Sequence, residues 1–214
     1  MKVFRDLEIS GSASSLMKLI ETIESKLENG WTRDREAEKR LEETGSRGEK
    51  WFCFSCTEKE GREAAKLWFT FKGENTLYVS NIVPVEFGKL TYDQYNTILK
   101  DFHSKFIEPV GQPLGLKYIL TSDVKDIEDW VSDETAKKLR RFSAAANRGL
   151  LHPLDRERWF DFLVSAHKES SELDETTLMR WLIEHEKWSE EVASELAEEY
   201  ENARALLKFY DKAR

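Results

Sequence analysis

The segment 147–158 carries the most varied polar chemistry in the sequence. Arg148, His152 and Arg156 could together hold a phosphate or a carboxylate, because a guanidinium group matches planar anions. Asp155 could orient the imidazole of His152, or it could cap the following helix. The segment is also typical of an ordinary helix junction, since a glycine ends one helix and a proline opens the next. Two interpretations therefore stand: a structural junction, and an anion-binding site in a ligand-binding regulator or an enzyme.

The two cysteines, Cys53 and Cys56, have the C-x-x-C spacing of metal-binding and thiol-redox sites. The aromatic residues around them favour a β-strand, in which positions three apart point to opposite faces. A structural zinc ion needs four ligands, and the sequence has no second C-x-x-C and no His-x-x-x-His pair. We therefore predict two buried structural thiols, with no metal and no other cofactor.

Motifs that define common active sites are absent from the sequence. It has no phosphate-binding G-x-x-x-x-G-K-[ST], no G-x-G-x-x-G, no G-x-S-x-G and no H-E-x-x-H. The four histidines are scattered, and no nucleophile, base and orienting group can be named together. These observations favour a protein that is not an enzyme without deciding the question, and they identify no catalytic residue.

Charge is distributed unevenly along the chain. The sequence has 33 basic and 41 acidic residues, a net charge of −8, which argues against a general nucleic-acid coat protein. Residues 169–201 hold twelve acidic and two basic residues. Electrostatic complementarity would suit this segment to a basic protein partner. Alternatively, these acids solvate the surface or pair within a helical bundle. The acids that we predict to contact such a partner are Glu190, Glu191, Glu195, Glu198 and Glu199.

A basic block precedes the acidic one. Residues 137–158 contain seven basic and two acidic residues. The basic residues include Lys137, Lys138, Arg140 and Arg141. A helix spreads these four side chains over more than one face. Nucleic-acid binding through residues 137–141 is therefore a second alternative, which the acidic residues downstream disfavour because they repel phosphates.

Trp68 and Tyr78 are candidates for a second partner surface. Trp68 falls on the same side of its predicted strand as Lys66 and Thr70, opposite the apolar side chains. If no helix covers this side of the sheet, Trp68 and Tyr78 form an exposed aromatic pair, and interfaces favour such anchors. The alternative is that a helix covers both.

The first half of the chain reads as mixed α and β. Alternating apolar residues predict strands, and 3.6-residue periodicity with capping serines or threonines predicts helices. The order is β-α-β-β-β-α-β, an α+β fold with an antiparallel sheet and two helices. Residues 35–43 read as a weak helix or a mobile loop. The strands are predicted at residues 2–9, 51–56, 65–71, 76–83 and 116–121, and the helices at 16–27 and 90–107.

From Ser122 onward the apolar periodicity is helical throughout. Four helices joined by short connections predict a C-terminal four-helix region. We therefore predict two domains, 1–121 as the α+β sheet domain and 122–214 as the all-helical domain.

No run of residues approaches the length of an apolar membrane span, and charges interrupt the N-terminal segment. The sequence therefore predicts a soluble, cytoplasmic protein that does not enter membranes. The hypothesis that unites these observations is a non-enzymatic acidic binding factor, with an immunity, antitoxin-like or adaptor role. Its C-terminal helices would grip a basic protein.

Overall fold

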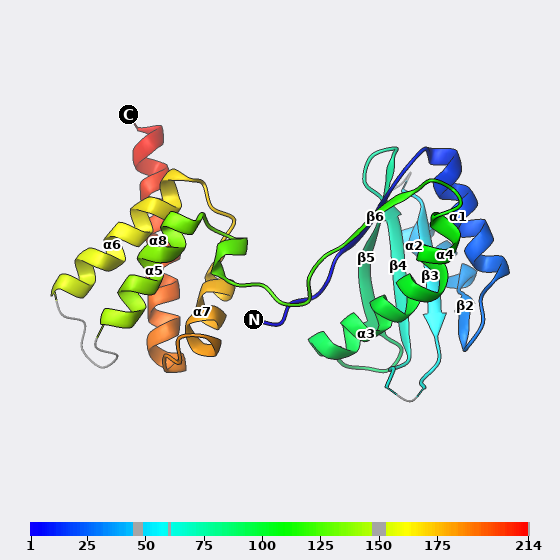
Figure 1. The fold of residues 1–214 in the computed structure, drawn as a ribbon, viewed down its shortest axis with the longest axis horizontal. Helices are drawn as coiled ribbons and strands as arrows, with labels where there is room; N and C mark the ends of the chain where they lie inside the picture. Colours follow the sequence, from blue (N-terminus) through cyan, green and yellow to red (C-terminus); the bar gives the residue numbers. More distant parts are fainter. Residues whose placement is uncertain (45–48, 60, 147–152, 214) are drawn as a thin grey trace. The chain divides into compact units, whose positions relative to one another are not determined.

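The computed structural model describes residues 1–44, 49–59, 61–146 and 153–213. The chain divides into two compact units (Figure 1). Residues Lys2–Asp123 form the first, which we call the sheet unit. Residues Val124–Arg214 together with Met1 form the second, which we call the helical unit.

A six-stranded antiparallel sheet forms the centre of the sheet unit, with the strand order β2-β3-β4-β5-β1-β6. The apolar residues of β4 alternate in burial, because successive side chains of a strand point to opposite faces. The strands are β1 (Leu7–Ser10), β2 (Trp31–Arg33), β3 (Trp51–Cys56), β4 (Ala65–Phe71), β5 (Thr76–Pro84) and β6 (Lys117–Leu120).

Helices α1 and α3 contribute apolar side chains to the core on one face of the sheet. Ser12 caps α1 (Ala13–Ser25), and Thr91 forms a capping box with Gln94 at the start of α3 (Tyr92–Phe102). Phe102 lies at the centre of this core, with ring centroids 4.8 Å from Trp31 and 4.9 Å from Phe54. Helices α1 and α3 therefore begin at capping residues and bury their apolar faces, as the sequence predicts.

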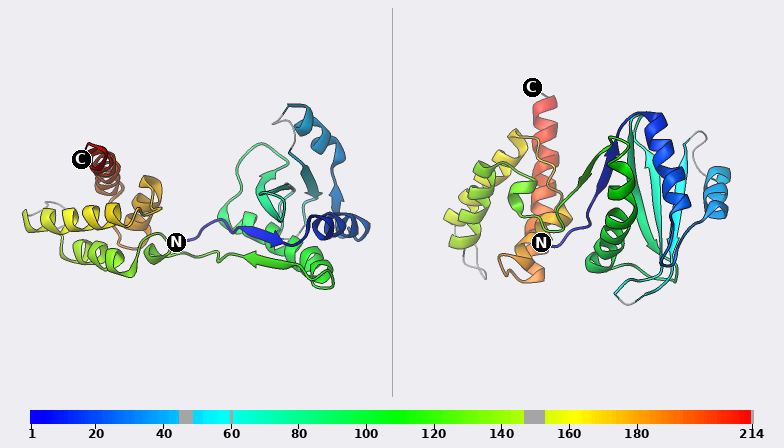
Figure 2. Two further views of the ribbon diagram at one scale, coloured as in Figure 1. Left: turned by 90° about the horizontal axis from the view of Figure 1, so that it is seen from above. Right: turned by 45° about the vertical axis from the view of Figure 1, so that its right-hand side comes forward.

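Three features of the sheet unit differ from the prediction. The first strand begins at Leu7 instead of residue 2, and β2 at Trp31 was not expected. The predicted helix over 90–107 is divided into α3, a π-helical turn (His103–Ile107) and α4 (Glu108–Gly111). Residues Arg35–Thr44 form helix α2, which decides between the two interpretations of that segment. Helix α2 contacts β3 and lies on the other side of the sheet from α3 (Figure 2).

The helical unit contains the four predicted helices, and α5 packs on α6 while α7 packs on α8. Ser132, Asp174 and Ser189 cap α5, α7 and α8, because each side chain accepts a hydrogen bond from a backbone N–H in the first turn. A 3₁₀ turn (Ile127–Asp129) precedes them. The helices are α5 (Asp133–Ala145), α6 (Pro153–Lys168), α7 (Glu175–Glu184) and α8 (Glu190–Lys212).

Large aromatic side chains fill the core of the helical unit. Trp159 and Trp181 are fully buried, and Phe142 packs between Trp159 and Trp188, with centroid distances of 5.0 and 5.6 Å. Met1 joins the same cluster. The structure thus shows an α+β chain with a helical C-terminal region. Among the described residues, no helix combines the length and apolarity needed to cross a membrane.

Candidate functional site

Helix α8 carries the acidic residues that the sequence predicts to bind a partner. Ser189 begins the helix, and Glu190 and Glu191 stand in its first turn, where negative charge complements the helix dipole. The opposite side of α8 is anchored in the core by apolar side chains that include Leu196 and Tyr200. The helix is therefore held on one side and presents the other to solvent.

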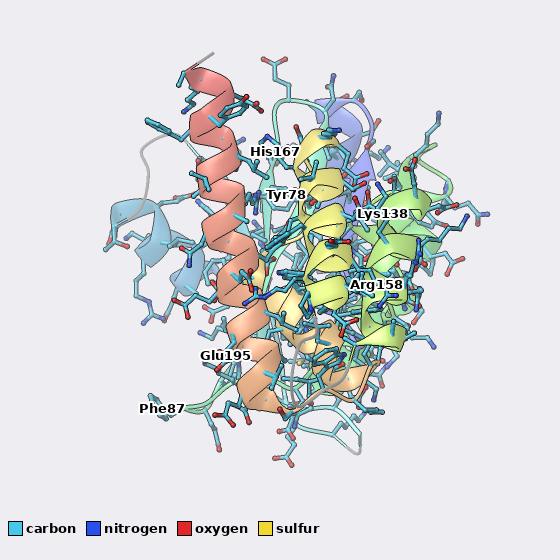
Figure 3. All side chains as sticks on the ribbon, turned by 90° about the vertical axis from the view of Figure 1, so that its left-hand side faces the viewer. Tyr78, Phe87, Lys138, Arg158, His167 and Glu195 are labelled. Atoms are coloured by element: carbon cyan, nitrogen blue, oxygen red, sulfur yellow. The ribbon has the colours of Figure 1, made fainter. Side chains whose placement is uncertain are left out.

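Four carboxylates lie on the solvent side of α8, and we call them the acidic stripe: Glu190, Glu191, Glu195 and Glu198. All four residues are exposed, and none has a hydrogen bond or ion pair from its side chain to a described residue. Three of them, Glu191, Glu195 and Glu198, follow the spacing of one helix face. Figure 3 shows Glu195 projecting from the side of α8.

Glu199 differs from the acidic stripe. Its side chain is half-buried and accepts a hydrogen bond from Arg156 Nη1 at 2.7 Å. The geometry thus separates the five predicted acids into four that face solvent without a described partner and one that joins α8 to α6.

Upstream arginines do not neutralise the acidic stripe. Arg140 pairs with Asp126 and Glu128, both at 3.0 Å, and these acids precede α5. Arg158 pairs with Asp155 on its own helix at 2.8 Å. These arginines of the basic block thus form ion pairs with acids outside the acidic stripe. In the described part of the helical unit, the negative charge of the stripe is therefore available to a partner.

The solvent side of α8 continues into apolar residues. Phe209 follows Glu191 by eighteen residues, about five full turns, so both point in the same direction from the helix axis. Leu206 and Phe209 are 67% and 71% exposed. The helical spacing of the apolar residues places Leu207 and Tyr210 on the same side of α8 as Leu196 and Tyr200, but Leu207 is half-buried and Tyr210 is exposed. Periodicity gave no signal for this exposure, because it cannot show where the neighbouring helices end.

The predicted anion site at 147–158 lies partly outside the described residues, which include neither Arg148 nor His152. Asp155 is 4% exposed and Arg156 is engaged by Glu199. Asp155 pairs with Arg158 on its own helix and Arg156 pairs with Glu199 on α8, and the anion site as a whole stays a prediction.

The four basic residues of the predicted patch at 137–141 have different surroundings in the structure. Lys138 lies 3.4 Å from Glu134 and donates to Ser165, and Arg140 pairs with acids as described above. Lys137 and Arg141 are exposed. Figure 3 shows Lys138 and Arg158 on the side where α5 and α6 meet. Among the described residues, two of the four basic side chains of the patch, those of Lys137 and Arg141, have no hydrogen-bond or ion-pair partner, which weakens the nucleic-acid alternative.

Trp68 and Tyr78 are both half-buried and do not form an aromatic pair with each other in the described contacts. Trp68 packs edge-on against Trp51 at 6.4 Å, while Tyr78 stands opposite Thr70 and Glu8 in the strand register. A hollow of about 610 Å³ beside Tyr78 is lined by residues that include Ile119. The two aromatics are thus separate features of one sheet face.

The two cysteines are buried and unpaired. Burial, together with the nearby charge of Asp34, raises the pKa of the Cys53 thiol to about 12. A thiol with such a pKa does not supply a thiolate at neutral pH. Within the described ranges, no group of three or more potential metal ligands occurs.

Comparison with known proteins gives no relative: no protein-family model, no curated protein and no solved structure matches this chain.

Proposed function

We propose that this protein is a non-enzymatic, acidic protein-binding factor that holds a basic partner on the solvent side of α8. An immunity, antitoxin-like or adaptor role would use such a surface. The observation that carries the proposal is the acidic stripe, whose four carboxylates have no partner among the described residues. Unpaired charge of one sign on a rigid helix attracts an oppositely charged partner and speeds its association.

Leu206 and Phe209 give the proposed surface an apolar part. Interfaces draw most of their affinity from a few buried apolar and aromatic anchors, and charges at the rim contribute mainly to specificity and association rate. The partner that fits α8 therefore presents basic side chains opposite Glu191, Glu195 and Glu198, and an apolar side chain opposite Phe209.

The proposal is tested by removing charge while keeping side-chain shape. Glu191→Gln, Glu195→Gln and Glu198→Gln are combined in one variant, which is used with the wild-type chain as bait in its native cell. Each lost surface ion pair contributes roughly 0.5 kcal/mol, so three lower the affinity about tenfold. Quantitative mass spectrometry should show a basic protein on the wild-type bait and its loss from the variant.

A matched control removes three exposed acids elsewhere: Glu21→Gln, Glu36→Gln and Glu42→Gln, on α1 and α2 of the sheet unit. Their side chains also have no partner among the described residues, and the total charge changes by the same amount. This control should retain the partner. Equal capture by all three baits, or equal loss from both variants, would reject binding through α8.

A further inference from the structure

A groove of about 750 Å³ lies between the C-terminal parts of α6 and α8 in the helical unit. Figure 3 shows His167 between these two helices. The lining is mostly apolar, and Val164 and Leu207 stand on opposite walls. Ligand sites for small molecules in proteins have volumes of roughly 300–1,000 Å³ and similar apolar linings. The groove therefore has the size and composition of a small-molecule site.

Several polar groups in the groove have partners within the protein. His167 Nε2 lies 2.7 Å from Asp211 Oδ2, which joins the two helices across the groove. The buried hydroxyl of Tyr200 donates to the carbonyl oxygen of Leu173 at 2.9 Å. Arg204 Nη1 donates to the same carbonyl and lies 3.5 Å from Glu201. These contacts already provide partners for the polar groups of His167, Tyr200 and Arg204, so a ligand in the groove does not have to supply them.

Three lysines stand around this groove: Lys168, Lys208 and Lys212. Each is exposed, and none has a hydrogen bond or ion pair from its side chain to a described residue. Lys168 and Lys212 end their helices, where positive charge complements the dipole, but Lys208 lies a turn earlier in α8. The helix dipole therefore explains the positions of Lys168 and Lys212, but it does not explain that of Lys208. A ligand with a negative charge would explain why three lysines lie beside apolar side chains in a chain of net charge −8.

We propose that the groove binds a single-chain amphiphile with a carboxylate head group, a free fatty acid. Its alkyl chain would lie along Val164 and Leu207, and its carboxylate would meet the ammonium groups of Lys208 and Lys212. Lysine stems can lie along apolar surface while their charged heads reach water, so these residues suit the open end of such a site.

The proposal does not depend on the acidic stripe, because Lys208 and Lys212 lie ten or more residues beyond Glu198 along α8. Failure of one proposal therefore leaves the other standing.

The probe is laurate at concentrations where it remains monomeric, titrated into the full chain by isothermal calorimetry. Dodecyltrimethylammonium has the same chain length and the opposite charge, and it serves as the matched ligand control. Laurate should bind saturably, and the cationic amphiphile should bind at least about tenfold more weakly. Absence of laurate binding, or equal affinity for the two amphiphiles, would overturn the proposal.

Charge reversal assigns the binding to this groove. The double variant Lys208→Glu and Lys212→Glu should weaken laurate about tenfold or more, because each reversal replaces an attraction by a repulsion. The control Lys137→Glu and Arg141→Glu makes the same change on exposed residues of α5 and should leave affinity unchanged. Equal effects of the two pairs would overturn the proposal. So would binding of an acidic helical peptide by Lys208 and Lys212 without binding of laurate.

Discussion

The carboxyl group of Asp126 connects three elements of the helical unit, so its removal gives a quantitative test of this packing. It accepts hydrogen bonds from Trp181 Nε1 at 2.8 Å and from the Ile127 backbone N–H at 2.7 Å, and it lies 3.0 Å from Arg140 Nη2. Burial alone would raise the pKa of Asp126. The hydrogen bonds from Trp181, Ile127 and Arg140 and the charge of Arg140 lower it to about 2.

The expected loss follows from this pKa. A fall from the ordinary value of 3.8 to about 2 corresponds to about 2.4 kcal/mol at 1.36 kcal/mol per pKa unit. Because the side chain is 45% exposed, solvent screens the interaction, and we discount the figure by half. Asp126→Asn should therefore lower the free energy of unfolding by about 1 kcal/mol at pH 7.

The sign of the pH dependence is also determined. The pKa of Asp126 is lower in the folded chain than in the unfolded one, so its contribution is complete above about pH 5 and is lost as the pH falls towards 2. In urea unfolding at pH 7, 5 and 3, the gap between wild type and Asp126→Asn should shrink by about half at pH 3. The control Asp161→Asn changes an exposed carboxylate of α6 and should show almost no gap. A gap of constant size from pH 7 to pH 3 would show that the charge of Asp126 does not stabilise the fold.

Two further outcomes test the sheet unit. Phe102→Ala should lower the free energy of unfolding by about 3–5 kcal/mol, since Phe102 is fully buried among aromatic rings, whereas Phe87→Ala should cost at most about 0.5 kcal/mol because Phe87 is fully exposed. Similar losses in urea unfolding would contradict the core assignment. The thiol of Cys53, with its pKa raised by burial to about 12, should resist iodoacetamide at pH 8 in the folded chain and react after unfolding in urea. Rapid labelling of the folded chain would contradict this burial.

Part of the candidate site followed from local sequence. Glu191, Glu195 and Glu198 share one helix face because their spacing matches the helical repeat, and these acids were predicted to contact a partner. The separation of Glu199 from the stripe was not predictable, because its partner Arg156 lies 43 residues away on another helix. Likewise, the groove at Val164 and Leu207 exists only where α6 and α8 lie side by side.

By itself, the sequence determined the features that depend on neighbours within a few residues. Alternation in β4, the caps at Thr91 and Ser189, and the change to helical periodicity near residue 122 are all local, and the structure contains the corresponding elements. The tertiary structure alone decided which of these elements meet. Strand β2 forms because Trp31 packs on Phe102 and pairs with β3, contacts that no short window of sequence contains. Exposure at the end of α8 has the same physical origin, since burial depends on which distant side chains arrive to exclude water.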